Sequence, residues 1–431
     1  MTIVIATAGT RGDVAPYTGL GDRLRAAGHK VAIATHARFA DLVTGAGFEF
    51  REIPGDPREL FESKAFQRWA NGGSSVRKLV SWPPRPPKRN VFAELVEGMR
   101  GVADGVLAAV GDDTDLLLLS NSVSAFGHHA AEATGVPSMG VYWGPVLPTA
   151  AFPPIMAGIR TMGPAVNRAL GALLDSATDP LYSRAVRDLR AGAGLPATGH
   201  RAVRLKHERQ RWPIYCGFSP SVVPRPADWR DGVEVVGYWW PYADQGWEPS
   251  PRLVDFLDSG PPPVFVGFGS HASGEGERLA GIAGKALRAA GVRGVVQAGW
   301  ADLSTLDGDD LLSIGEVPYE WLFPRMAAVV HHAGVGTTAA GIRAGVPAVP
   351  VPVWLDQPFW AGRLAALGVS PAPIPLTGLT APRLADAVRA AVSDPSYGRR
   401  ATELARRVAQ EDGAASVVTA VEAMLEVNRG G

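Results

Sequence analysis

An acidic residue follows the first apolar run of the chain, inside a turn bracketed by glycines. Residues 9–13 read Gly-Thr-Arg-Gly-Asp and come directly after an apolar run at residues 2–7. A carboxylate such as Asp13 could remove a proton from an acceptor hydroxyl, and a general base of this kind contributes about 10²–10⁴-fold to a rate. Asp is also a preferred residue at a helix N-terminus, and Pro16 suits a first helical turn. The spacing alone leaves both interpretations open.

A second glycine-rich turn carries histidine and threonine. Residues 331–338 read His-His-Ala-Gly-Val-Gly-Thr-Thr and separate an apolar run from a helical pattern. Backbone N–H groups at a helix N-terminus form an anion site, to which a histidine or hydroxyl can add a donor. The turn lacks the lysine of an NTPase phosphate loop, which favours a diphosphate held by neutral donors. The structural alternative is a tight turn capped by threonine.

Two further polar turns follow apolar runs. Asp356 and Gln357 precede a helical pattern, and they suit vicinal sugar hydroxyls because Asp accepts hydrogen bonds while Gln both donates and accepts. Residues 264–270 read Val-Phe-Val-Gly-Phe-Gly-Ser, so Ser270 could donate to a phosphate oxygen. Helix capping by Asp356 is the alternative, and many turns between strands and helices resemble residues 264–270.

Apolar strands that alternate with amphipathic helices must position these four turns. Strands are expected at residues 2–7, 30–35, 116–120, 138–143, 264–268, 294–298, 311–314, 327–331 and 348–353. The alternation predicts an α/β protein with two domains in series, each with a parallel sheet covered on both faces. Ligands of such sheets bind beyond the carboxyl ends of the strands, where all four turns fall.

Bulk composition excludes several classes of protein. The 431 residues include 42 Lys and Arg and 42 Asp and Glu, which argues against a nucleic-acid binder because such proteins carry a basic excess. A single cysteine, Cys216, excludes an internal disulfide and a cysteine-based zinc site. No signal peptide is recognisable and no apolar run approaches the ~20 residues of a transmembrane helix. A cytoplasmic protein without a transmembrane segment is expected.

Taken in order, these segments resemble the inverting glycosyltransferases of the family that includes bacterial glycopeptide-antibiotic glycosyltransferases and sterol glucosyltransferases. Residues 9–16 look like the family's Gly-Ser-Arg-Gly-Asp-x-x-Pro start, with Thr10 in place of Ser. Residues 215–240 look like its interdomain passage, and residues 315–323 like its base-binding turn. Residues 332–338 and 356–360 look like its phosphate and sugar motifs. The resemblance covers nearly the whole chain.

The resemblance implies two Rossmann-like domains facing across a cleft, the GT-B fold. The expected organisation is an acceptor-binding domain at residues 1–219, a linker at 220–250, a nucleotide-sugar-binding domain at 251–410, and a helix at 411–431 that returns to the first domain. Asp13 is implied as the general base, with no metal and no cofactor beyond a UDP- or dTDP-sugar co-substrate. The implied donor-binding residues are Thr10, Arg11, Gly12, Ser270, Val317, His332, Gly334, Gly336, Thr337, Thr338, Asp356 and Gln357.

This chain departs from relatives of the family at two positions. Many relatives use a histidine where this chain has Asp13, so the base here must be a carboxylate. In plant relatives a glutamate that binds the ribose falls about where Ala340 stands, which leaves UDP and dTDP as alternatives.

The acceptor is expected to be an apolar small molecule bound by the first domain, such as a polyketide, macrolide, flavonoid, sterol or glycopeptide aglycone of bacterial secondary metabolism. Trp82, Trp143 and Phe152 are candidate contacts, since small-molecule pockets are mostly apolar. Each of these aromatics could equally belong to a core. Residues 77–89 combine Trp82 with prolines and five basic residues. They could form a solvated loop or a lid over the acceptor, whereas peripheral membrane contact is not expected.

Three other classes compete with a transferase. A nucleotide-sugar 2-epimerase can share the fold, but it needs no acceptor pocket, so acceptor-dependent release of nucleoside diphosphate separates the two. A non-catalytic relative would serve as a binding protein, although Asp13, His332 and the Asp356–Gln357 pair are retained. An oxidoreductase is disfavoured because no G-x-G-x-x-G motif follows the first strand.

Overall fold

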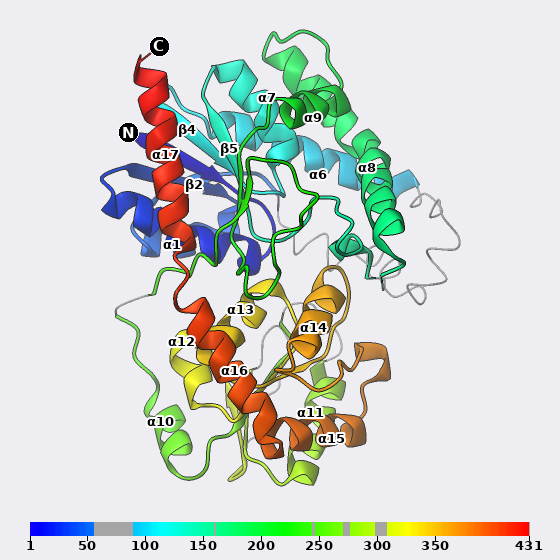
Figure 1. The fold of residues 1–431 in the computed structure, drawn as a ribbon. Coiled ribbons are helices and arrows are strands. Elements are labelled where there is room, and N and C mark those ends of the chain that lie inside the picture. The colour runs from blue at the N-terminus through cyan, green and yellow to red at the C-terminus, as the bar shows by residue number, and fades with distance from the viewer. Residues whose placement is uncertain (56–88, 159–160, 244–245, 270–275, 298–307, 431) are drawn as a thin grey trace. The chain divides into compact units, whose positions relative to one another are not determined.

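The structure is a computed structural model that describes residues 1–55, 89–158, 161–243, 246–269, 276–297 and 308–430 (Figure 1). The chain divides into two compact units. The first comprises Met1–Asp244 together with Glu411–Gly431, and the second comprises Gln245–Gln410. No helix among the described residues is long and apolar enough to cross a membrane.

The first unit is built on a seven-stranded parallel sheet with the order β3-β2-β1-β4-β5-β6-β7. Its strands are β1 (Thr2–Ala6), β2 (Lys30–Thr35), β3 (Glu49–Glu52), β4 (Thr114–Leu119), β5 (Ser138–Tyr142), β6 (Ile214–Cys216) and β7 (Val233–Val235). All five residues of β1 are buried, as expected for a strand in a sheet covered on both faces. Because all seven strands run parallel, their carboxyl ends lie at one edge of the sheet.

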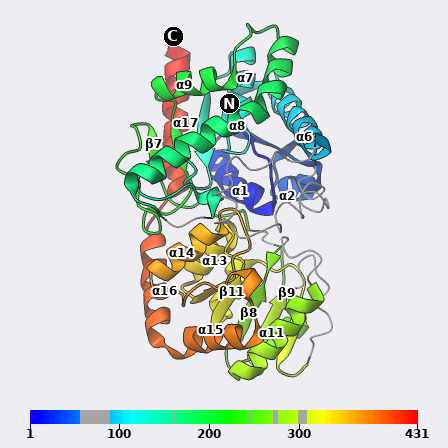
Figure 2. The same ribbon diagram turned by 90° about the vertical axis from the view of Figure 1, so that its right-hand side faces the viewer.

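Seven α-helices accompany this sheet in the described residues (Figure 2). They are α1 (Arg11–Ala26), α2 (Ala40–Gly45), α6 (Arg89–Ala108), α7 (Ser124–Thr134), α8 (Pro164–Gly192), α9 (His200–Arg209) and α17 (Gly413–Gly430). One face of the sheet packs against α1 and α17, where Leu20 and Val417 share a core with Ile3 and Ile5. This core fixes the position of α1, whose first turn contains Asp13.

Helices α7, α8 and α9 pack around buried histidines. The ring of His128 stacks on that of His207 with centroids 3.9 Å apart. His129 Nδ1 lies 2.9 Å from Arg190 Nη1, and the Arg190 guanidinium also binds Glu132 at 2.7 Å. Burial lowers the pKa of His128 well below its ordinary value and lowers that of His129 to about 4. These helices are therefore joined through uncharged imidazoles.

The second unit contains a five-stranded parallel sheet with the order β10-β9-β8-β11-β12. Its strands are β8 (Val264–Gly267), β9 (Gly294–Gln297), β10 (Leu311–Ile314), β11 (Ala328–His331) and β12 (Ala348–Pro350). Its α-helices are α10 (Pro251–Asp258), α11 (Gly276–Ala290), α12 (Tyr319–Leu322), α13 (Val335–Ala344), α14 (Gln357–Ala366), α15 (Ala381–Ser393) and α16 (Pro395–Val408). Helices α11 and α15 cover one face, while α10 and α12 contribute to the core on the other.

The predicted fold class, two α/β units with parallel sheets, is confirmed, although two boundaries differ. Residues 220–250 were expected to form a linker, but β7 lies within them and belongs to the first sheet. The last helix was expected to begin at residue 411, and α17 begins at Gly413, after α16 ends at Val408. Asp412 Oδ1 accepts a hydrogen bond from the Ala415 N–H, 3.0 Å, and so caps a new helix after the break.

Candidate active site

Asp13 lies in the first turn of α1, at the carboxyl end of β1. It is the third residue of the helix, and the N-cap is Thr10. Asp13 Oδ2 accepts hydrogen bonds from the Thr10 N–H, 2.7 Å, and the Thr10 hydroxyl, 3.0 Å. Gly9 has a φ of +139°, and a Cβ there would overlap the Asp13 carboxyl group. The turn therefore requires glycine at residue 9 for the carboxylate to sit where it does.

The two oxygens of the Asp13 carboxylate have different surroundings. Both hydrogen bonds from Thr10 go to Oδ2, and no described residue donates to Oδ1. Burial raises the pKa of Asp13 from 3.8 to about 6, although the hydrogen bonds from Thr10 oppose this. One oxygen thus stabilises the helix start while the other can accept a proton near neutral pH. The structural and catalytic interpretations of Asp13 are compatible.

The turn after β4 lies next to the turn that carries Asp13, because β1 and β4 are neighbours. Ser122 Oγ accepts a hydrogen bond from the Ala8 N–H, 3.1 Å, and lies 2.7 Å from Ser120 Oγ. Tyr17, which is fully buried on α1, donates to the Val141 carbonyl at 2.7 Å. These serines were not predicted as site residues from the sequence. Their positions directly after an apolar strand were the available signal.

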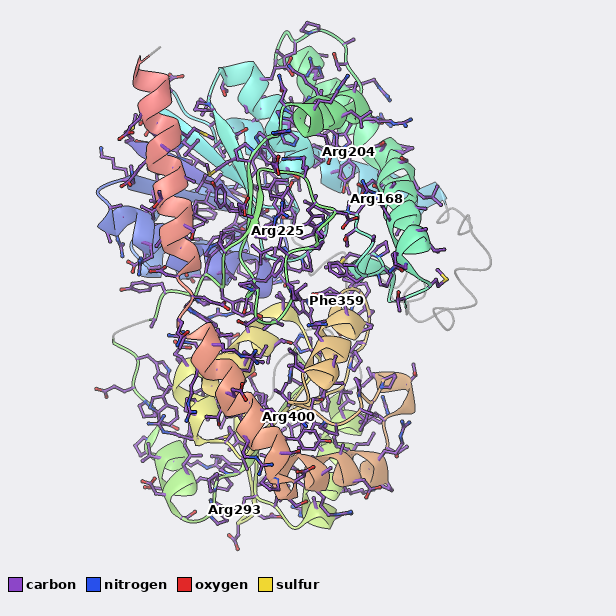
Figure 3. The ribbon with its side chains drawn as sticks, in the orientation of Figure 1. Arg168, Arg204, Arg225, Arg293, Phe359 and Arg400 are labelled. Atoms are coloured by element: carbon purple, nitrogen blue, oxygen red, sulfur yellow. The ribbon has the colours of Figure 1, made fainter. Side chains whose placement is uncertain are left out.

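The candidate acceptor contacts fall after β5. Trp143 is buried, with an exposed fraction of 8%, and Phe152 is partly exposed. Asp228 anchors the intervening loop: it accepts from the Thr149 hydroxyl, 2.6 Å, and from the Ala150 N–H, 2.8 Å. Arg168 on α8 (Figure 3) contacts the same carboxylate at 3.3 Å. Although burial opposes them, these bonds hold the pKa of Asp228 below its ordinary value.

In the second unit, the turns after β8, β11 and β12 share one edge of the sheet. Strand β11 pairs with both β8 and β12. The ring of His332 lies over two glycines from different turns, since a Cβ on either Gly269 or Gly334 would overlap it. Glycine is thus required at both positions for this imidazole to lie beside the start of α13. The structure brings His332, Gly334 and Gly336 together.

The backbone around this turn is held in an unusual conformation. Ala333 has a φ of +64°, and Leu355, in the turn after β12, has a φ of +54°. Non-glycine residues rarely adopt this region, and such strain concentrates at functional sites. Gly334 is the N-cap of α13, so the first N–H groups of the helix lack helical partners. These groups can bind an anion.

The two threonines at the start of α13 differ in burial. Thr337 is partly exposed, whereas Thr338 has an exposed fraction of 2% and lines a small cavity. The exposure of Thr337 suits the predicted phosphate contact. The burial of Thr338 does not, because its hydroxyl oxygen is itself buried.

Asp356 and Gln357 lie at the start of α14. Asp356 is partly exposed, and its Oδ2 accepts from the indole N–H of buried Trp360 at 2.9 Å. Gln357 has an exposed fraction of 1%, and its Oε1 accepts from the Val353 and Trp354 N–H groups at 2.8 and 3.3 Å. The amide oxygen therefore shapes the turn, and Gln357 is as buried as Thr338, so only its amide N–H₂ remains for the predicted sugar contact.

The other predicted residues are dispersed or not described. Val317 is partly exposed between β10 and α12 and lines a hollow of about 330 Å³ with Trp247 and Leu312. Arg11 is exposed at the first residue of α1, and Gly12 follows it in the first unit. Ser270, Trp82 and the predicted lid at residues 77–89 lie outside the described residues, except for the backbone of Arg89 in α6.

Comparisons with known proteins agree with this geometry. Residues 3–153 match the glycosyltransferase family 28 N-terminal domain, and residues 298–424 match the erythromycin biosynthesis protein CIII-like C-terminal domain. The O-mycaminosyltylonolide 6-deoxyallosyltransferase of Streptomyces fradiae is 37% identical over 99% of this chain and 98% of its own. A sterol 3-beta-glucosyltransferase of Arabidopsis thaliana is 33% identical over 97% of this chain and 65% of its own.

A solved structure shares the fold. The crystal structure of the glycosyltransferase VinC in complex with dTDP has a TM-score of 0.67, 20% identity, and coverage of 99% of this chain and 100% of its own. Each unit thus has the parallel α/β form of a GT-B glycosyltransferase. The chain belongs to the glycosyltransferase family that contains the macrolide and sterol enzymes named above. It is a glycosyltransferase.

Proposed function

We propose that this glycosyltransferase moves a hexose or deoxyhexose from a UDP- or dTDP-sugar to a hydroxyl of an apolar small molecule, with inversion and without a metal ion. The observation that carries the proposal is the Asp13 carboxylate, whose pKa is raised to about 6 by burial and whose Oδ1 is unpaired among the described residues. A base with a pKa near the operating pH is well suited to proton abstraction.

In the proposed reaction, the acceptor oxygen forms a bond to the anomeric carbon as the bond from that carbon to the diphosphate breaks. Asp13 receives the hydroxyl proton, and the nucleoside diphosphate leaves with the electron pair. A single displacement inverts the configuration, so an α-linked donor gives a β-glycoside. Negative charge develops on the diphosphate, where preorganised donors lower the barrier.

The donor is assigned to the second unit. The free N–H groups at the start of α13, with His332 and Thr337, would bind the diphosphate. The partly exposed Asp356 carboxylate and the Gln357 amide N–H₂ would bind sugar hydroxyls. The backbone of Val317 would bind the base. The dTDP complex of VinC supports a thymidine nucleotide as one candidate.

The acceptor is assigned to the first unit, near Asp13 and the loop that Asp228 anchors. The Streptomyces fradiae relative is a 6-deoxyallosyltransferase named for a tylonolide acceptor, and the plant relative is named for sterols. Both names support an extended apolar alcohol as substrate. The higher identity and near-complete mutual coverage of the first relative favour a polyketide-type acceptor from secondary metabolism.

A screen of donors against acceptors, read by mass spectrometry, tests the function, and NMR of the product gives the anomeric configuration. The proposed mechanism predicts that Asp13→Asn lowers kcat by on the order of 10²-fold or more. Asp22→Asn, at a partly exposed residue of the same helix, is the matched control. Turnover near wild type in Asp13→Asn, or a retained anomeric configuration, contradicts the mechanism. Donor turnover without any acceptor points instead to epimerisation.

A further inference from the structure

A small cavity lies between α13, α14 and α16, behind the turn at residues 331–334. This turn, which is proposed to bind the diphosphate, is called the phosphate turn below. The volume of the cavity is about 10 Å³, which matches the space that one water molecule needs. Most of its lining is apolar, with Ile342, Leu364 and Leu404 among the wall residues. Two polar residues, His331 and Thr338, also line it. The cavity therefore combines the size of a single water with a polar side.

His331 has a defined tautomer. Its Nδ1 accepts a hydrogen bond from the Ala333 N–H at 3.1 Å, so the neutral ring must carry its proton on Nε2. Burial lowers the pKa of His331 to about 4, which keeps the ring neutral at physiological pH. The side chain has an exposed fraction of 1%, and Nε2 is buried without a hydrogen-bond partner among the described residues. Nε2–H is a donor directed at no described acceptor.

Thr338, like His331, has a buried polar atom with no hydrogen-bond partner among the described residues. Its exposed fraction is 2%, and its hydroxyl oxygen is likewise buried without a described partner. Leaving two such groups unpaired in an apolar interior is unfavourable, and proteins satisfy buried polar groups with partners or ordered water. A water between these residues would accept from His331 Nε2–H and bond with the Thr338 hydroxyl.

We propose that this cavity binds one structural water shared by His331 and Thr338, and that His331 is a positioning residue for the phosphate turn. Its Nδ1 holds the N–H of Ala333, the residue with φ +64°, and so aims His332 and the start of α13. The water holds the other side of the ring and prevents a ring flip. The effect on donor binding rests on the proposed function of this turn, whereas the water site does not.

A high-resolution crystal structure and ¹⁵N NMR of the imidazole nitrogens, both on the full chain, test the site. The expected result is one water within hydrogen-bond distance of both side chains, with His331 protonated on Nε2 at neutral pH. Thr338→Val, which keeps the side-chain shape, should lose this water, while Ile342→Val, a control on the same wall, should keep it. A dry cavity, a direct bond between the two residues, or a proton on Nδ1 overturns the proposal.

Kinetics test the positioning role. His331→Asn retains an acceptor near Nδ1, whereas His331→Leu retains none. We expect Leu to raise the donor KM by about tenfold with a smaller change in kcat, and Asn to restore most of the loss. Equal effects of Leu and Asn would refute positioning. If His332→Ala leaves affinity for free nucleoside diphosphate unchanged while the water is present, the proposed function fails and the water site stands.

Discussion

Asp13 combines a structural role at the start of α1 with a proposed catalytic role. Its Oδ2 accepts from Thr10 in the manner of a capping box, while burial raises the pKa of the carboxyl group to about 6. A folded-state pKa above the unfolded value of 3.8 means that ionised Asp13 costs stability as pH rises through about 6. An uncharged Asn at residue 13 should therefore be tolerated by the fold at neutral pH. The expected defect of Asp13→Asn is in rate alone.

The same pKa predicts the pH dependence of the reaction. Only the ionised carboxylate can accept the proton, so kcat/KM should fall about tenfold per pH unit below about 6 and level off above it. Steady-state rates measured between pH 4.5 and 8 in a range of buffers would locate this limb. A profile flat across pH 6 would show that Asp13 does not act as the base. The residual activity of Asp13→Asn should lack the limb.

Residue types could be predicted from the sequence more readily than residue environments. The order of motifs identified Asp13, His332 and Asp356 as candidates, and the structure places each at a strand end. The sequence did not reveal that the Thr338 hydroxyl points inward or that Gln357 is buried. At Thr338, the surrounding cavity is also lined by Leu364 of α14 and Leu404 of α16, which come later in the chain and are brought close only by folding.

At the level of elements, the turn before α13 and the turn before α14 should have separable roles. His332→Ala removes a donor at the predicted diphosphate site, so affinity for free nucleoside diphosphate should fall. Gln357→Ala removes a group assigned to the sugar, so free nucleoside diphosphate should still bind while the intact donor binds more weakly. Calorimetric titration of both variants with both ligands checks this. The reverse pattern would overturn the two assignments.

The loop after β5 depends on a residue far from it in sequence. Asp228 binds the Thr149 hydroxyl and the Ala150 N–H, and these contacts fix the segment that leads to Phe152. Asp228→Ala should loosen this segment and raise the acceptor KM several-fold, with the donor KM unchanged. Glu234→Ala, an exposed residue of β7, serves as a control. An altered donor KM with a normal acceptor KM would remove this loop from the acceptor site.

Most long elements could be predicted because buried parallel strands leave a continuous apolar run. Strands β6 and β7 could not, since each has only three residues and shows no periodicity. The break between α16 and α17 has a cause that the local sequence pattern does not show. It depends on Asp412 as a cap and on Gly413, where a Cβ would overlap the Gly237 carbonyl. This contact joins residues that are distant in sequence, so the local sequence pattern does not predict it.

For the whole molecule, acid should be destabilising near pH 5. His128, His129, His200 and His207 all have pKa values lowered by burial, and that of His129 falls to about 4. The unfolded chain binds protons at its ordinary pKa of 6.5, so it takes up more protons than the folded chain between about pH 6.5 and 4. The free energy of unfolding should fall through this window, by about 1.4 kcal/mol per unit of pKa difference at each site.

Urea unfolding at a series of pH values, followed by circular dichroism, measures this dependence. His200→Gln should reduce the slope, because a neutral amide cannot take up a proton. Asp13 and Asp175, whose pKa values burial raises to about 6, contribute with the opposite sign in this window, so the comparison between His200→Gln and wild type is the test. A slope that is the same in both proteins would show that His200 does not contribute to it. The assay needs no substrate, so it is independent of the proposed reaction.

The last helix has a consequence for how the protein is made. Val417, Val421 and Leu425 of α17 belong to the core that also contains Ile3 and Ile5 of β1. On the ribosome, residues 245–410 emerge as one continuous stretch and can complete their own unit, whereas the first unit must wait for residues made after all of these. The N-terminal sheet therefore leaves the exit tunnel first and completes its core last, and during that interval a chaperone has an apolar surface to bind.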